Sequence, residues 1–125
     1  MPITTTSFHN LKALKDKKFI CIAICNSLPA AATGQVIHIP SVAPDWETIK
    51  KYRYAQIDQK QFKQEYIKKL EKTDAAKPEF FMSLKNDEDK LLIALLCHEP
   101  KGKFCHRKIL AEWLNEQYHM NITEL

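Results

Sequence analysis

Two short groups of reactive side chains lie close together near the C-terminal end of the sequence. The first is Cys97-His98-Glu99 and the second is Cys105-His106-Arg107. Cysteine acts as a nucleophile or a metal ligand, histidine and glutamate transfer protons, and arginine binds carboxylates and phosphates through two parallel hydrogen bonds. Their spacing predicts a functional site in this stretch, and three kinds of chemistry fit these residues.

Thiol chemistry would use Cys105 as the nucleophile. A cysteine beside a histidine and an arginine at the start of a helix has a lowered thiol pKa, so the thiolate is favoured. His106 or Glu99 would then do the acid/base work. The spacing from Cys97 to Lys103 imitates a C-x5-R phosphatase loop, but a lysine replaces the arginine that planar phosphate recognition requires.

Metal binding would use the four donors Cys97, His98, Cys105 and His106. Adjacent residues of a strand point in opposite directions, so all four donors are not expected to converge. Neither cysteine pair has the separation found in a zinc knuckle. The sequence therefore predicts no metal ion and no other cofactor.

Anion binding requires the fewest coincidences. The backbone N–H groups at the start of the helix, the Arg107 side chain and the Ser27 hydroxyl would hold a phosphate or carboxylate. Glu99 would accept a hydrogen bond from a ribose hydroxyl or a base edge. In the purely structural alternative, Cys105 caps the helix, Arg107 pairs with Glu99, and Cys97 belongs to the core.

The elements that position these groups are two apolar strands and one helix. Leu91–Leu96 and Phe19–Cys25 are apolar on both faces, which is typical of central strands in a parallel sheet. Cys105–Gln117 has the apolar periodicity of a helix that packs on a sheet. If the strands are parallel neighbours, Cys25, Asn26 and Ser27 lie beside Cys97, His98 and Glu99, at the sheet edge where α/β proteins bind ligands.

The intervening segments complete the predicted architecture. Pro29–Pro44 reads as a long irregular connection, in which His38 either points into the site or lies on a short edge strand. Helices are expected after the caps Asp45 and Asp58 and again from Pro78, and Asn121–Leu125 is expected to form an edge strand. Phe62, Tyr66 and Leu70 form an apolar helical stripe, and the Tyr66 hydroxyl is a further candidate donor near the pocket. The predicted fold is one α/β domain over residues 1–125, with three layers and a small open, mainly parallel, Rossmann-like sheet.

The run ALLCHEPKGKFCHRKILAEWL, residues 94–114, resembles the "LLC-E…CHR…A-WL" signature of the domain of unknown function 488 (DUF488) family, including its short phage and prokaryotic members. The helix around Phe62 and Tyr66, and the stretch Asn121–Leu125, are also similar to parts of that family. Cys25–Pro29 departs from it, because no basic or aromatic residue precedes the proline. The resemblance implies an α/β fold and a site centred on Cys105-His106-Arg107, and it implies no particular activity.

The composition restricts the classes of binding partner that are expected for this chain. The formal net charge of +4 comes from lysines spread along 125 residues, so no specific nucleic-acid binding is expected. Two glycines exclude a glycine-rich phosphate loop. No signal peptide and no membrane-spanning run are evident, which predicts a cytoplasmic protein with four reduced cysteines.

Three hypotheses follow from the sequence. The leading one is a binding domain for an anionic, phosphate-bearing or nucleotide-like small molecule, with Arg107, Cys97, His98, Asn26, Ser27, His38 and Tyr66 as candidate binding residues. The second is an enzyme that uses Cys105, His106 and Glu99. The third is a module that binds a protein partner through Pro29–Pro44. A monomer and an oligomer are both compatible with the sequence.

Overall fold

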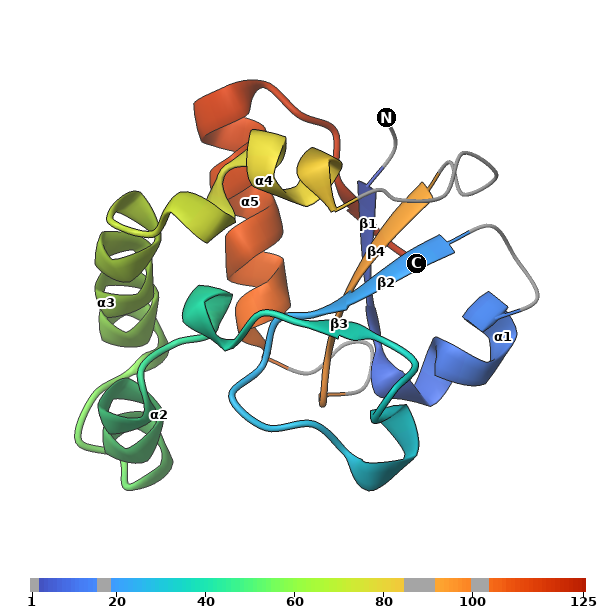
Figure 1. The fold of residues 1–125 in the computed structure, drawn as a ribbon. Helices are drawn as coiled ribbons and strands as arrows, with labels where there is room; N and C mark the ends of the chain where they lie inside the picture. Colours follow the sequence, from blue (N-terminus) through green and yellow to red (C-terminus); the bar gives the residue numbers. More distant parts are fainter. Residues whose placement is uncertain (1–2, 16–18, 85–91, 100–103) are drawn as a thin grey trace.

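A five-stranded parallel sheet forms the centre of the molecule in the computed structural model, which describes residues 3–15, 19–84, 92–99 and 104–125 (Figure 1). The strands are β1 (Ile3–Ser7), β2 (Phe19–Ala23), β3 (Ile37–His38), β4 (Leu92–Cys97) and β5 (Thr123–Glu124). Their order across the sheet is β3-β2-β4-β1-β5, and every described pair is parallel. The predicted α/β class is confirmed.

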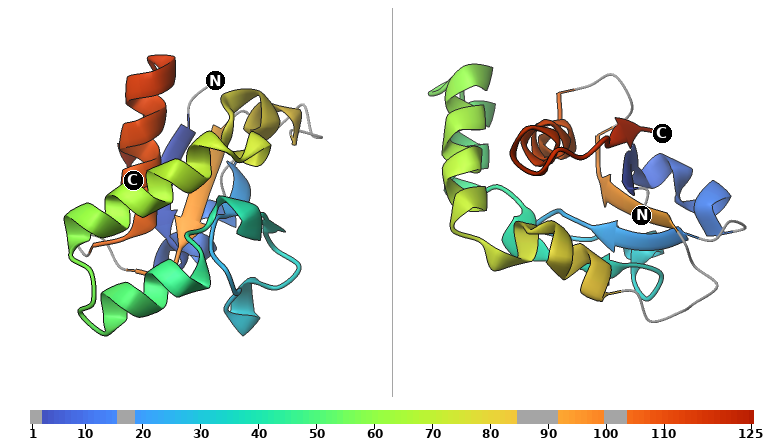
Figure 2. Two further views of the ribbon diagram at one scale, coloured as in Figure 1. Left: turned by 90° about the vertical axis from the view of Figure 1, so that its left-hand side faces the viewer. Right: turned by 90° about the horizontal axis from the view of Figure 1, so that it is seen from above.

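Helices cover both faces of the sheet (Figure 2). On one side, α5 (His106–Tyr118) packs on β1 and β4, and α3 (Gln59–Glu71) packs against α5 and α2 (Trp46–Arg53). The short α4 (Pro78–Ser83) covers the same side through Phe81, which belongs to the main core cluster. On the other side, Leu11 and Leu14 of α1 (Leu11–Lys15) pack in a second, smaller cluster. The sheet therefore lies between two helical layers, as expected of a three-layer domain.

The two strands recognised from their apolar runs are parallel neighbours. Ile20 lies opposite Ile93 and Ala23 lies opposite Leu96, so the carboxyl ends of β2 and β4 lie side by side. Strand β2 ends at Ala23 rather than at the predicted Cys25, and the predicted start of β4 at Leu91 lies outside the described residues. This pairing confirms the predicted placement of the two strand ends.

The strand β1 was not predicted, and Phe19–Ala23 is therefore the second strand rather than the first. The sequence of β1, ITTTS, contains one large apolar residue, but β-branched threonine favours extended backbone. The hydroxyls of this strand are satisfied: Thr4 donates to the Thr123 carbonyl at 2.6 Å, and Thr6 accepts from the Asn10 amide at 2.7 Å. Hydrogen bonding thus allows a polar strand to occupy a buried place between β4 and β5.

Most of the predicted helix starts are confirmed. Asp58 and Gln61 form the complete capping box of α3, and Pro78 is the first residue of α4. Asp45 is the N-cap residue of α2, but its side chain makes no capping bond and instead pairs with Lys69 at 3.0 Å. The segment Pro29–Pro44 contains the edge strand β3 between the 3₁₀ turns Ala30–Ala32 and Pro40–Val42.

Asn121–Leu125 contains β5 at the opposite edge of the sheet, as predicted. Across the described parts of the chain, no helix is both long enough and apolar enough to cross a membrane.

Candidate functional site

A pocket of about 410 Å³ lies where the ends of β2 and β4 meet the start of α5. Its floor is formed by residues that directly follow the two strands or begin the helix: Cys25, Asn26, Ser27, His98, Glu99, Cys105 and His106. Six of these seven, all but Cys25, are among the candidate site residues predicted from the sequence. The structure therefore brings the two reactive groups together with the end of β2.

Helices α2 and α3 supply a wall that the sequence did not reveal as part of a site. Tyr52, Phe62 and Phe104 line the pocket and contact one another, with ring centroids 5.1–5.4 Å apart. Trp46 and Arg53 stand at the exposed part of the wall, and the Arg53 guanidinium carbon lies 5.3 Å from the Trp46 ring centroid. The signal for this wall was the spacing of Trp46, Ile49, Tyr52 and Arg53, which places them on one side of a helix.

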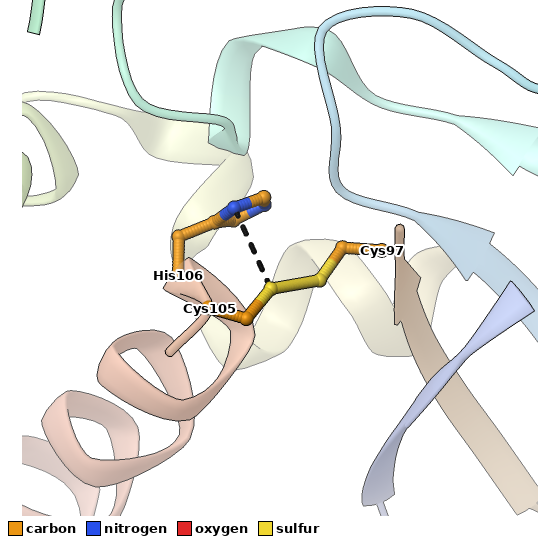
Figure 3. A group of neighbouring side chains, drawn as sticks. All are labelled: Cys97, Cys105 and His106. Carbon is orange, nitrogen blue, oxygen red and sulfur yellow. Dashed lines mark hydrogen bonds between the residues drawn. A yellow bond between two sulfur atoms is a disulfide. The ribbon is translucent and has the colours of Figure 1, made fainter. Parts of the chain in front are cut away.

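The two cysteines of the predicted site form a disulfide, Cys97–Cys105 (Figure 3). The prediction that all four cysteines are reduced thiols is wrong for this pair. Cys97 is the last residue of β4, and Cys105 is the N-cap residue of α5. Because the end of β4 and the start of α5 lie beside each other, the two buried sulfur atoms come together although they are eight residues apart in the sequence.

His106 is held in one orientation by the strand beside it. Its Nε2 donates a hydrogen bond to the Ile24 carbonyl, so in the neutral ring the proton is on Nε2 and Nδ1 is unprotonated. Nδ1 faces Cys105, 3.9 Å from its Sγ atom (Figure 3). Burial, together with the nearby positive charge of Arg107, lowers the pKa of His106 to about 4. The ring is therefore neutral at physiological pH.

Arg107 is buried in a hydrogen-bonded network rather than open to the pocket. Its side chain is 1 % exposed, and its Nε and Nη2 atoms donate to the two carboxylate oxygens of Glu124 at 2.9 and 2.8 Å. Nη1 donates to the Glu99 carbonyl oxygen at 2.6 Å and to Cys97 Sγ at 3.1 Å. Arg107 thus pairs as in the structural alternative, except that the carboxylate partner is Glu124 and Glu99 contributes its backbone.

A second hollow, of about 630 Å³, lies along α5 and is lined by residues including Arg107, Thr5 and Glu124. The Thr5 hydroxyl donates at 2.8 Å to Glu124 Oε1, the oxygen that also accepts from Arg107 Nε. This polar cluster therefore joins β1, β5 and α5. Sequence reasoning missed Glu124, because nothing local to the end of the chain indicates that it lies against Arg107.

The remaining predicted site residues position the floor of the pocket. His38 Nε2 donates to the Cys25 carbonyl at 2.6 Å, and the Asn26 amide donates to the Pro44 carbonyl at 2.8 Å. The Tyr66 hydroxyl donates to the Val42 carbonyl at 2.6 Å, and burial raises its pKa well above the usual value. Neither His38 nor Tyr66 lines the pocket. Hydrogen bonds of His38 and Pro44 therefore hold the segment Pro29–Pro44 against the residues that follow β2.

His98 lines the pocket but does not belong to the group formed by Cys97, Cys105 and His106. Its Nε2 donates to the Ser27 carbonyl at 2.7 Å, which links the ends of β4 and β2, and its ring contacts Phe8 at a centroid distance of 5.2 Å. Lys103, the basic residue of the phosphatase-like spacing, lies outside the described residues.

Comparison with known proteins identifies the family. The model of the DUF488-N3a family, described as the active DUF488-N3 subclade, matches residues 5–118. No curated protein and no solved structure shows a significant similarity to the chain. The matched region includes the last three residues of β1, the strands β2 to β4, both cysteines of the disulfide and all of α5. The chain therefore belongs to the DUF488-N3a family.

Proposed function

We propose that the pocket at the ends of β2 and β4 binds a phosphate-bearing, nucleotide-like small molecule. The observation that carries this proposal is the convergence of two parallel strand ends and a helix start on one pocket with an aromatic wall. A volume of about 410 Å³ is within the range of small-molecule sites, and this edge is where open α/β sheets bind ligands.

The wall suits a planar ring. Tyr52 and Phe104 present aromatic surface to the pocket, and Trp46 extends this surface at the mouth, where it is 53 % exposed. Base–aromatic stacking contributes about 1–3 kcal/mol per base where it has been measured by substitution. Glu99 and Asn26 also line the pocket, where the carboxylate and the amide oxygen would accept hydrogen bonds from a ribose or a base edge, since the Asn26 amide nitrogen already donates to the Pro44 carbonyl.

The positive charge for a phosphate comes from Arg53 and the start of α5. Arg107 is not available, because Glu124, the Glu99 carbonyl and Cys97 already occupy its guanidinium. Arg53 is exposed on the pocket wall and is held near Trp46. The N-cap residue Cys105 makes no side-chain capping bond, and the Lys108 N–H donates to the Cys105 carbonyl at 3.2 Å. The N–H groups of His106 and Arg107 are therefore the ones at the start of α5 that a phosphate would accept from.

A thermal-shift and calorimetric screen tests this proposal. Nucleoside monophosphates, nucleosides and inorganic phosphate would be added to the wild type, to Arg53→Gln and to Lys50→Gln. Lys50 is the matched control, because it carries the same charge on the same helix but does not line the pocket. Ligand at 100 times its Kd stabilises a protein by about 2.7 kcal/mol, which is readily measured.

The expected result is that a nucleoside monophosphate binds more tightly than the nucleoside. Arg53→Gln should weaken its binding about tenfold, since one charge-assisted hydrogen bond is lost, whereas Lys50→Gln should not. The proposal fails if none of these ligands binds, or if the two variants bind equally well.

A second candidate function is an enzyme with Cys105 as its nucleophile. His106 Nδ1 lies 3.9 Å from Cys105 Sγ, and the matched family is described as the active DUF488-N3 subclade. The disulfide must first be reduced to release the thiol. A His106 pKa of about 4 does not favour a thiolate–imidazolium pair, which is why ligand binding is the preferred proposal.

Alkylation of the reduced protein tests this candidate. If Cys105 is a nucleophile, it should react rapidly with iodoacetamide at neutral pH, and Cys105→Ser should remove that reaction. Alkylation no faster than that of a simple thiol would exclude an activated nucleophile.

A further inference from the structure

We propose that the reduced form of the protein binds one zinc ion through Cys97, Cys105 and His106, with a fourth coordination position open to the pocket. This inference concerns the floor of the same pocket, but it does not depend on which organic ligand the pocket takes.

The three donor atoms already form a compact group. Cys97 Sγ, Cys105 Sγ and a ring nitrogen of His106 all lie within 4.8 Å of one another (Figure 3). Zinc binds cysteine sulfur at about 2.3 Å and histidine nitrogen at about 2.0–2.1 Å, so a tetrahedral ion would hold S and N about 3.5 Å apart. The distance from Cys105 Sγ to His106 Nδ1 is 3.9 Å, so these two donors need little movement.

Two hydrogen bonds to residues of this group, one made by His106 and one by Cys97, are of the kind that metal ligands make. Metal-binding histidines usually donate their other ring N–H to a carbonyl or carboxylate, which fixes the ring. Here the Nε2–H of His106 donates to the Ile24 carbonyl, and Nδ1 is the atom that faces the sulfurs. Arg107 Nη1 donates to Cys97 Sγ at 3.1 Å, a hydrogen bond that would stabilise a thiolate more than a thiol.

The disulfide and the metal site are mutually exclusive states of the same two sulfurs. A dithiol reductant supplies two electrons and two protons, breaks the S–S bond and becomes a disulfide itself. The two cysteine thiols then lose their protons when they bind Zn²⁺, so the two thiolates balance the charge of the ion. The Cα atoms lie 7.7 Å apart, which is wider than in most disulfides and leaves room for the sulfurs to separate.

The fourth coordination position would face the pocket, because two of the three ligands line it. Cys105 and His106 line it, whereas Cys97 lies behind them at the end of β4. Within the described ranges the donor group has three residues, because His98 is directed to the Ser27 carbonyl instead. Three protein ligands and one exchangeable position are the pattern of catalytic rather than structural zinc sites. The prediction of no metal considered four donors together and overlooked these three.

Metal titration tests the site. The chelator-treated chain, reduced and kept under anaerobic conditions, would be titrated with Zn²⁺, and with Co²⁺ as a spectroscopic probe. The reduced chain should bind one ion and show sulfur-to-cobalt charge-transfer absorption, whereas the disulfide form should bind none. Cys97→Ser, Cys105→Ser and His106→Gln should each lose stoichiometric binding.

Cys21→Ser is the matched control, because Cys21 lies on β2 and packs on the second core cluster, outside the donor group. It should bind the ion like the wild type. X-ray absorption of the zinc-loaded wild type should show two sulfur neighbours at about 2.3 Å and at least one nitrogen, and it does not depend on how the variants fold.

The proposal is overturned if the reduced wild type binds no ion. It is also overturned if Cys97→Ser keeps full binding, or if the absorption data show fewer than two sulfur neighbours. None of these titrations contains a nucleotide, so failure here leaves the ligand proposal standing, and failure of the ligand screen leaves this one standing.

Discussion

The interpretation of Arg107 changes once its partner in the fold, Glu124, is known. In the sequence it is a cation near a helix N-terminus, a position that favours an anionic ligand. In the fold, Glu124 supplies the anion from within the chain and makes two parallel hydrogen bonds with the guanidinium. The same physical requirement is thus met by a carboxylate from β5, and the ligand proposal assigns phosphate recognition to Arg53 instead.

Replacement of Arg107 should therefore affect stability rather than ligand choice. Arg107→Ala leaves the Glu124 carboxylate, which is 28 % exposed, without its partner. Breaking a buried pair costs about 3–5 kcal/mol, and the partial exposure of Glu124 argues for the lower end of that range. Urea unfolding should show this loss, whereas Arg53→Ala, an exposed substitution, should stay within about 0.5 kcal/mol of the wild type. Equal stability of both variants would contradict the account of Arg107.

His106 predicts a pH dependence of stability. Its pKa is about 4 in the folded chain and 6.5 as an ordinary value, so the unfolded chain takes up the proton first as the pH falls. Stability should therefore decrease from pH 6.5 to about pH 4, by up to about 3 kcal/mol, and this contribution should level off below pH 4.

Comparing His106→Gln with the wild type isolates this contribution, because glutamine does not titrate. Unfolding free energies measured from pH 4 to pH 7 should fall less steeply in this variant. The matched control His9→Gln removes an exposed histidine and should keep the wild-type slope. A wild-type slope in His106→Gln would show that the histidine is not held neutral by the fold.

At the scale of elements, the parts predicted correctly are those with strong local signals. β4 and β2 have unbroken apolar runs, and α3 has a capping box formed by Asp58 and Gln61. β1 was missed because its threonines carry polar groups whose partners come from β5 and the turn after β1. Sequence periodicity does not reveal a strand that depends on such distant hydrogen bonds.

The capping box is expected to stabilise α3, which supplies Phe62 to the pocket wall. Gln61 N–H donates to Asp58 Oδ1 at 2.8 Å, and Asp58 N–H donates to Gln61 Oε1 at 3.0 Å. Asp58→Ala should lower the free energy of unfolding by about 1 kcal/mol. Asp74→Ala removes an exposed acid that pairs with Lys77, and should change stability little in the same denaturant titration. Equal effects of the two variants would show that the cap contributes nothing.

At the scale of the whole molecule, the fold class and six residues of the pocket floor could be predicted, because both depend on the ends of two parallel strands. The aromatic wall could not, since it requires α2 and α3 to pack over residues that lie about forty to sixty positions further along the chain. The disulfide was missed for a related reason. Its formation depends on the start of α5 lying beside the end of β4, and cysteine spacing does not specify this placement.

The position of the ligand is the central claim, and amide chemical-shift mapping with a nucleoside monophosphate tests it most directly. The two hollows beside α5 share Phe104 and Cys105 but otherwise have different linings, so the perturbed signals distinguish them. We predict the largest shifts at Asn26, Ser27, Arg53 and His106, with little change at Lys108, Asn115 and Ile122. Shifts concentrated on the latter three residues, or no shifts at saturating ligand, would contradict the assignment of this pocket.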